Sequence, residues 1–187
     1  VSRAFEHTLA VLRAGGAQID DIALAPLAEL SGLQAQGGFT AAESWSWHRA
    51  RLLQREADYD PRVAQRIRRG EAIGAADYID LLQARTDWIT RVQDALRGFD
   101  AVLSPTVPMV APAIAPLLSS DSRFFAINGL LLRNPSVVNF LDGCALSLPC
   151  QAPGQAPVGL MLAAAGGQDH ALLGLGEAVE QALRQRA

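Results

Sequence analysis

The sequence contains no lysine, since all 16 of its Lys and Arg residues are arginine. This absence excludes every mechanism whose catalytic amine must come from this chain. A P-loop lysine, a Schiff base and Ser-Lys hydrolysis are all excluded in this way. Chemistry of these kinds would need a lysine from another polypeptide segment.

Cysteine and histidine are also scarce. Cys144 and Cys150 lie in a segment that reads as a strand and its exit, which places them about 20 Å apart, too far for a disulfide. We therefore expect two reduced thiols and a cytoplasmic protein. His7, His48 and His170 lie far apart without the spacing of metal ligands, so we expect no metal site, and nothing implies a cofactor.

No apolar run is long enough to cross a membrane, and no charged-then-apolar leader is present, so we expect no membrane partner. The net charge is -3, and the arginines are dispersed, which disfavours nucleic acid as a partner. The densest basic group lies among acidic and apolar residues and predicts a solvated helix face with at most one functional arginine: Arg62, Arg66, Arg68 and Arg69. Because the chain begins at Val1, we expect it to be a piece of a longer protein.

Half of the residues are hydrophobic and 19% are charged, which predicts a packed core. Apolar periodicity and helix stop signals predict helices over residues 2–14, 26–32, 40–52, 61–70, 75–97, 123–141 with a break near Pro135, and from 168 or 169 onward. Strands are predicted over residues 17–24, 101–103, 144–148 and 158–162. The mixture predicts an α/β fold in which helices pack on a mixed β-sheet.

Local signals refine three of these helices. Thr40 and Glu43 have the spacing of a capping box, and Asp60 precedes Pro61 as an N-cap precedes a first helical residue. The stripe expected to face the core of the long helix consists of Tyr78, Leu82, Ile89, Val92 and Leu96.

Four short sequence motifs, which we call phrases, follow one another in the second half of the chain. They are Asp100-Ala-Val-Leu-Ser-Pro-Thr-Val-Pro108, Arg133-Asn-Pro135 leading to Asn139, Gly143-Cys-Ala-Leu-Ser-Leu-Pro-Cys150, and Ala156-Pro-Val-Gly-Leu-Met-Leu162. Together they resemble the C-terminal portion of the amidase signature family. The resemblance covers residues 37–187, and residues 1–36 read as linking helices and a strand of the same domain.

The resemblance implies amide-bond hydrolysis by a serine, a bridging serine in a cis peptide and a neutral lysine. Burial can keep a lysine uncharged, and backbone N–H groups of a glycine-rich loop stabilise the oxyanion. In that family these parts lie N-terminal to the matched region. The nearest serine pair here, Ser119-Ser120, lies in a segment without glycine, and we interpret it as a solvated loop. The resemblance thus implies that part of the sheet and the whole triad are missing, that this chain holds no catalytic residue, and that alone it is inactive.

The sequence departs from the family pattern at three positions. Cys144 stands where proline is usual, and Gln151 stands where glycine is usual. Leu132 lies where members that take ammonia from glutamine for tRNA-linked transamidation carry an acid, which argues against that role.

Four residues are candidates for binding the substrate. Arg66 resembles an arginine that pairs with a substrate carboxylate, which a bidentate guanidinium can do; otherwise it is a surface charge. Asn139 borders the expected funnel or satisfies buried backbone, and Glu43 lines the pocket or completes a helix cap. Phe39, like Trp45 and Trp47, lines an acyl pocket or fills the core.

Three functions compete. The chain is the C-terminal portion of an amidase that shapes the pocket for a small amide and needs the N-terminal catalytic portion, or it is a non-catalytic, amidase-like binding module. Hydrolysis by this chain alone through a serine such as Ser104 lacks a base. Open sheet edges and an uncovered face also predict association, either with the missing portion or as a homo-oligomer.

Overall fold

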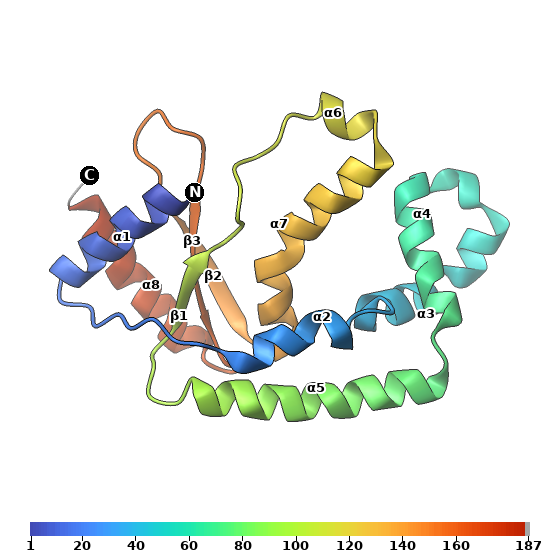
Figure 1. The fold of residues 1–187 in the computed structure, drawn as a ribbon, viewed down its shortest axis with the longest axis horizontal. Coiled ribbons are helices and arrows are strands. Elements are labelled where there is room, and N and C mark those ends of the chain that lie inside the picture. Colours follow the sequence, from blue (N-terminus) through green and yellow to red (C-terminus); the bar gives the residue numbers. More distant parts are fainter. Residues whose placement is uncertain (186–187) are drawn as a thin grey trace. The chain divides into compact units, whose positions relative to one another are not determined.

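The computed structural model describes residues 1–185 and divides the chain into two compact units (Figure 1). One unit comprises Val1–Ala23 and Val92–Ala187, and the other comprises Leu24–Arg91. The long helix α5, Ala75–Ala95, carries the chain from the second unit back into the first.

The first unit is built on a three-stranded sheet in the order β1-β3-β2, with β1 Val102–Pro105, β2 Cys144–Pro149 and β3 Gly159–Ala164. Both pairings are antiparallel, and Leu162 of β3 lies opposite Leu103 on one side and Leu146 on the other. The α/β class expected from the sequence is confirmed, but these strands form an antiparallel sheet rather than a mixed one. β3 is buried along most of its length, whereas β2 exposes every second residue, because only one of its faces packs on the core.

Helices α1, Ser2–Ala14, and α8, Asp169–Arg184, cover one face of this sheet. Alternate residues of β3 point into the resulting core, and Leu160 and Leu162 are wholly buried. The helices predicted over these two ranges are confirmed. The core takes its buried members from both helices and β3: Leu12, Leu160, Leu162, Ala164, Leu172 and Val179.

The opposite face receives helix α7, Asp121–Leu141, which follows the short helix α6, Ala115–Leu118. Val138 of α7 packs with Met161 and Ala163 of β3. The break predicted near Pro135 is absent, since α7 runs through this proline. A proline costs a helix one backbone hydrogen bond, but burial of the following turn offsets that loss. Ser120, expected in a loop, caps α7 by accepting a hydrogen bond from the Arg123 N–H at 3.3 Å.

The second unit contains η1 Ala25–Glu29, α2 Leu30–Leu33, α3 Gly38–Gln54, η2 Glu56–Asp58, α4 Pro61–Arg68, η3 Arg69–Ala72 and most of α5. Leu52, Ala64 and Ile67 form its small core. Gly70 lets η3 touch α3, because a Cβ atom there would overlap the Ala41 carbonyl.

The cap predicted at Asp60 is confirmed, since its carboxylate accepts the N–H groups of Arg62 and Val63 at 2.8 and 3.4 Å. The capping box predicted for Thr40 and Glu43 is wrong. Helix α3 begins earlier, at Gly38, with Gly37 in a left-handed conformation at its N-cap (φ 111°). Glu43 instead accepts a hydrogen bond from the Tyr78 hydroxyl.

Two further predictions fail for reasons of burial. Residues 17–24 form no strand; Ile19 packs on the core, but the neighbouring Asp20 and Asp21 are exposed. On α5, Leu82 is 42% exposed, whereas Trp88 is wholly buried. Leu82 therefore lies off the buried stripe, and Trp88 supplies its centre.

Candidate functional site

Residues from all four of the sequence phrases meet at one end of the sheet in the first unit. The Thr106 N–H donates to the Gly159 carbonyl oxygen at 2.8 Å. The Asn134 side-chain amide donates to the Pro105 carbonyl oxygen at 2.7 Å. The hydroxyl oxygens of Thr106 and Ser147 lie 2.5 Å apart. Segments separated by tens of residues are thus joined at what we call the hydroxyl cluster: Pro105, Thr106, Asn134, Ser147 and Gly159.

The Thr106 and Ser147 hydroxyls come from the two outer strands of the sheet but lie on the same face. Thr106 follows β1 and Ser147 lies in β2, and these outer strands are separated by β3, so their backbones are about 10 Å apart. The side chains meet over Gly159 of the middle strand. A Cβ atom at Gly159 would lie within 2.5 Å of the Ser147 oxygen and closer still to that of Thr106. Glycine is therefore required here for the two hydroxyls to touch.

Asn134 ties helix α7 to the same place. It lies in α7 immediately before Pro135, and its amide reaches the carbonyl at the end of β1. The cluster thereby joins all three strands and α7, and the segment between β1 and α6 leaves from it.

The hydroxyl cluster offers hydrogen-bond donors and acceptors but no acid, base or amine. A hydroxyl pair without a base is a poor nucleophile. Within residues 1–185, no group of three or more His, Cys, Asp or Glu side chains could hold a metal ion. The cluster can hold backbone in place, and the reacting groups of a hydrolase would have to come from other residues.

Two of the predicted substrate-binding residues come together in the second unit. Phe39 packs edge-on against Tyr78, with ring centroids 5.6 Å apart, and the Tyr78 hydroxyl donates to the Glu43 carboxylate at 3.0 Å. The Arg85 guanidinium lies 5.4 Å from the Phe39 ring centroid. Burial, followed by the hydrogen bond to Glu43, raises the pKa of Tyr78 above its usual value. Sequence reasoning did not identify Tyr78 or Arg85 as members of this group.

Arg66 lies at a different place in the same unit. With Thr40, Ser44 and Arg69 it lines a hollow of about 280 Å³ between α3 and α4. Phe39 and Glu43 are not among the residues that line this hollow. Asn139 belongs to the first unit, where its side chain is exposed on α7 and its carbonyl oxygen accepts the Asp142 N–H. It is therefore not the buried amide that was the alternative to a pocket role.

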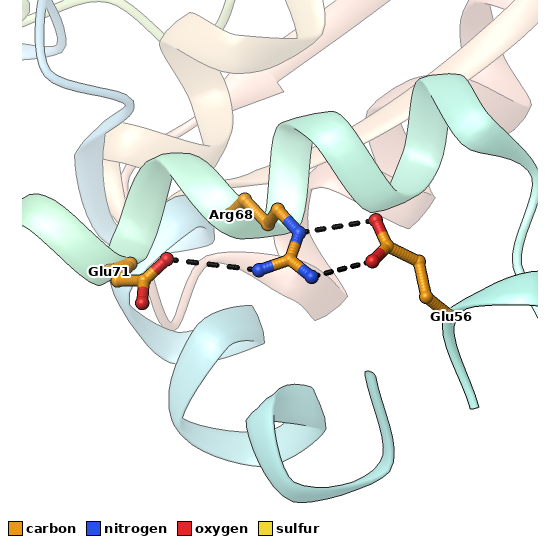
Figure 2. A network of polar contacts seen from close by, with 3 residues as sticks. All are labelled: Glu56, Arg68 and Glu71. Carbon is orange, nitrogen blue, oxygen red and sulfur yellow. Dashed lines mark hydrogen bonds and ion pairs between the residues drawn. The ribbon is translucent and has the colours of Figure 1, made fainter. Parts of the chain in front are cut away.

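The arginines beside Arg66 have other partners. Figure 2 shows Arg68 between two carboxylates, with bonds of 3.2 and 2.6 Å to Glu56 and a contact of 3.9 Å to Glu71. The hydrogen bond to Glu56 raises the pKa of Arg68, and the same bond lowers the pKa of Glu56. Arg69 donates to the Ala35 carbonyl oxygen at 3.0 Å. Arg68 is thus committed to structural pairing.

The chain matches the family model described as "Amidase" over residues 1–173 and belongs to that family. It is 25% identical over 189 residues to a 2-amino-5-chloromuconic acid deaminase of Comamonas testosteroni, covering 99% of this chain and 40% of that protein. It is 36% identical over 129 residues to an indoleacetamide hydrolase of Agrobacterium vitis, covering 63% of this chain and 27% of that protein. The chain therefore spans less than half the length of these relatives.

Solved structures share the fold. A serine-to-alanine variant of Kluyveromyces lactis allophanate hydrolase superposes with a TM-score of 0.85 at 24% identity, covering 97% of this chain and 29% of that one. A crystal structure of an amidase superposes with a TM-score of 0.77 at 26% identity, covering 97% of this chain and 42% of that one. Among the described residues, no helix is both long and apolar enough to cross a membrane.

Proposed function

We propose that this chain is the C-terminal portion of an amide hydrolase, whose Ser–cis-Ser–Lys triad lies on an N-terminal portion outside it. One observation carries the proposal. The chain has the fold of amidases over 97% of its length, yet covers only 42% of a matching amidase and contains no lysine. It follows that this chain would form part of the substrate pocket, and that the catalytic lysine would be supplied by the N-terminal portion.

We assign the recognition of the substrate's polar end to the hollow at Arg66. Arginine binds carboxylates through two parallel hydrogen bonds, and the hydroxyls of Thr40 and Ser44 could complete the shell. One relative is named for a muconic acid derivative and another for an acetamide, so an amide that also carries a carboxylate is the substrate class we favour. Phe39 and Glu43 of the second unit and Asn139 of the first are the remaining residues that we propose take part in substrate binding.

The partner in this proposal is the N-terminal catalytic portion, and the site of action is the cytoplasm, which suits two unpaired thiols. Large apolar side chains that are exposed in the first unit support association: Phe99, Leu118, Leu130, Leu132 and Leu173. The same exposed side chains would suit the alternative of a non-catalytic, amidase-like binding module, or a homo-oligomer.

The test combines the chain with a matching N-terminal portion and measures hydrolysis of aryl and aliphatic amides with and without a carboxylate. We expect turnover only from the pair. In that pair, Arg66→Ala should raise KM for the carboxylate-bearing amides alone, and Arg49→Ala, an exposed arginine on α3, is the matched control. Binding of the two portions without turnover would support the binding module, and turnover by the chain alone would overturn both.

A further inference from the structure

We propose that the hydroxyl pair of Thr106 and Ser147 is a positioning device that holds residues 106–116 as an apolar surface of the first unit, and that the acyl part of the amide substrate binds against this surface. This inference rests on the proposed function. The hydroxyl pair would then govern substrate binding more than the chemical step.

The segment needs such a device because it has little structure of its own. Residues 106–114 form neither helix nor strand, and Pro108 and Pro112 within them cannot donate backbone hydrogen bonds. Its start is held by the Thr106 N–H bond to Gly159 and by the hydroxyl pair, while Asn134 holds Pro105 just before it.

The hydroxyl pair is also expected to add little to the stability of the fold. Ser147 lies on the exposed side of β2, where hydrogen bonds compete with water. Gly159, which makes room for the pair, weakens a central strand because it has no side chain to pack. A glycine in a strand interior is typical of a place that another group must approach closely, and here that group is the hydroxyl pair.

The segment itself presents apolar side chains. Val110 is 40% exposed and Ile114 is 73% exposed, and both lie between the hydroxyl cluster and α6. Moving the start of the segment would move both side chains, because the prolines limit bending within it. This explains how two hydroxyls at the sheet could control an apolar surface several residues away.

The first test measures how far the amide N–H at position 106, which donates to the Gly159 carbonyl oxygen, is protected from hydrogen exchange in the chain itself. Thr106→Val and Ser147→Ala should lower this protection by about threefold to tenfold, as expected when one hydrogen bond is lost from a local opening equilibrium. Thr106→Ser retains the hydroxyl and should restore protection. Thr86→Val, which removes an exposed hydroxyl bonded to the Leu82 carbonyl, is the matched control.

The second test uses the same variants paired with the N-terminal portion, on amides of graded acyl length. Thr106→Val and Ser147→Ala should raise KM for the longer acyl groups while kcat stays within about twofold. Thr106→Ser should behave as the unaltered protein, and circular dichroism should show that all variants are folded.

The outcomes separate the two proposals. If the unaltered pair of portions shows no turnover, the proposed function fails, and hydrogen exchange still decides whether the hydroxyls hold the segment. If the protection of the amide at position 106 is unchanged in both hydroxyl variants, the positioning device is refuted. An equal fall in kcat for every amide, with KM constant, would also refute it.

Discussion

The indole N–H of Trp88 donates a hydrogen bond of 2.7 Å to the backbone carbonyl oxygen of Pro26, and the Trp88 side chain is wholly buried. This bond ties α5 to the start of η1 within the second unit. Trp88→Phe would keep most of the ring but remove the indole donor from the Pro26 carbonyl oxygen. We expect the free energy of unfolding to fall by about 0.5–1.5 kcal/mol, the typical net contribution of one hydrogen bond.

The measurement for Trp88 is urea unfolding followed by circular dichroism. Trp47→Phe is the control, because Trp47 is 84% exposed and its replacement should change stability by less than about 0.5 kcal/mol. Equal stability of the two variants would show that the indole bond contributes nothing.

Gly174 and Gly176 offer a matched pair on helix α8. A Cβ atom at Gly174 would meet nothing within 4 Å, whereas one at Gly176 would lie 2.6 Å from a methyl carbon of Leu146. Gly174→Ala should stabilise the protein by about 0.5–1 kcal/mol through lower entropy of the unfolded chain. Gly176→Ala should destabilise it by about 1–3 kcal/mol through overpacking against β2. Thermal unfolding of both variants checks this, and the same sign for both would contradict the packing of α8 on β2.

Asp60 and Thr40 test which polar residue caps a helix. Asp60→Ala removes the acceptor for two N–H groups at the start of α4, and should cost about 1 kcal/mol. Thr40 is in the first turn of α3 rather than at its cap, so Thr40→Ala should change stability by less than about 0.5 kcal/mol. Chemical denaturation distinguishes the two, and a larger loss for Thr40→Ala would reverse the assignment of the caps.

The pair of Glu56 and Arg68 predicts a pH dependence of modest size. The hydrogen bond from Arg68 lowers the pKa of Glu56 in the folded chain, so its stabilisation is present above the usual pKa of glutamate. That stabilisation is lost as the pH falls through the lower pKa of the folded state. Glu56→Gln should therefore be less stable than the unaltered chain at neutral pH and equally stable in acid.

Glu56 is exposed and Arg68 is partly exposed, so salt should shrink the difference at neutral pH. Glu71→Gln, which loses only the 3.9 Å contact, is the control and should show a smaller effect. A difference that persists unchanged in acid would mean that Glu56 acts through packing and not through its charge.

Burial raises the pKa of the Cys150 thiol above its usual value, although a hydrogen bond with Thr8 partly opposes the shift. The thiolate is the reactive form, so alkylation of Cys150 by iodoacetamide should be slower in the folded chain than in urea at the same pH. Cys144→Ser leaves Cys150 as the single thiol for this measurement. Equal rates in the two states would show that the thiol is not shielded.

The clearest successes of sequence reasoning are local. Apolar residues at helical spacing and a proline after an acidic cap predicted α1, α4 and α8, because each signal acts within a few residues along the chain. The failures depend on distant contacts. Residues 17–24 form no strand, and Trp88 rather than Leu82 is buried, because burial is decided by partners far away in the chain.

For the site, the sequence identified the four phrases as one family pattern, but it did not predict where in the fold they meet. The phrases signalled that Thr106, Asn134, Ser147 and Gly159 belonged to one family pattern, yet none of them was chosen as a site residue. The residues that were chosen divide between the units, with Phe39, Glu43 and Arg66 in the second and Asn139 in the first.

The sequence by itself determined that this chain holds no amine for catalysis, that its helices carry apolar stripes, and that its phrases match one enzyme family, since composition and short-range periodicity suffice for these conclusions. Only the tertiary structure decided that two hydroxyls 41 residues apart would meet over a glycine. Strand register and the crossing of side chains over a neighbouring strand depend on the packing of the whole sheet, which no local stretch of sequence specifies.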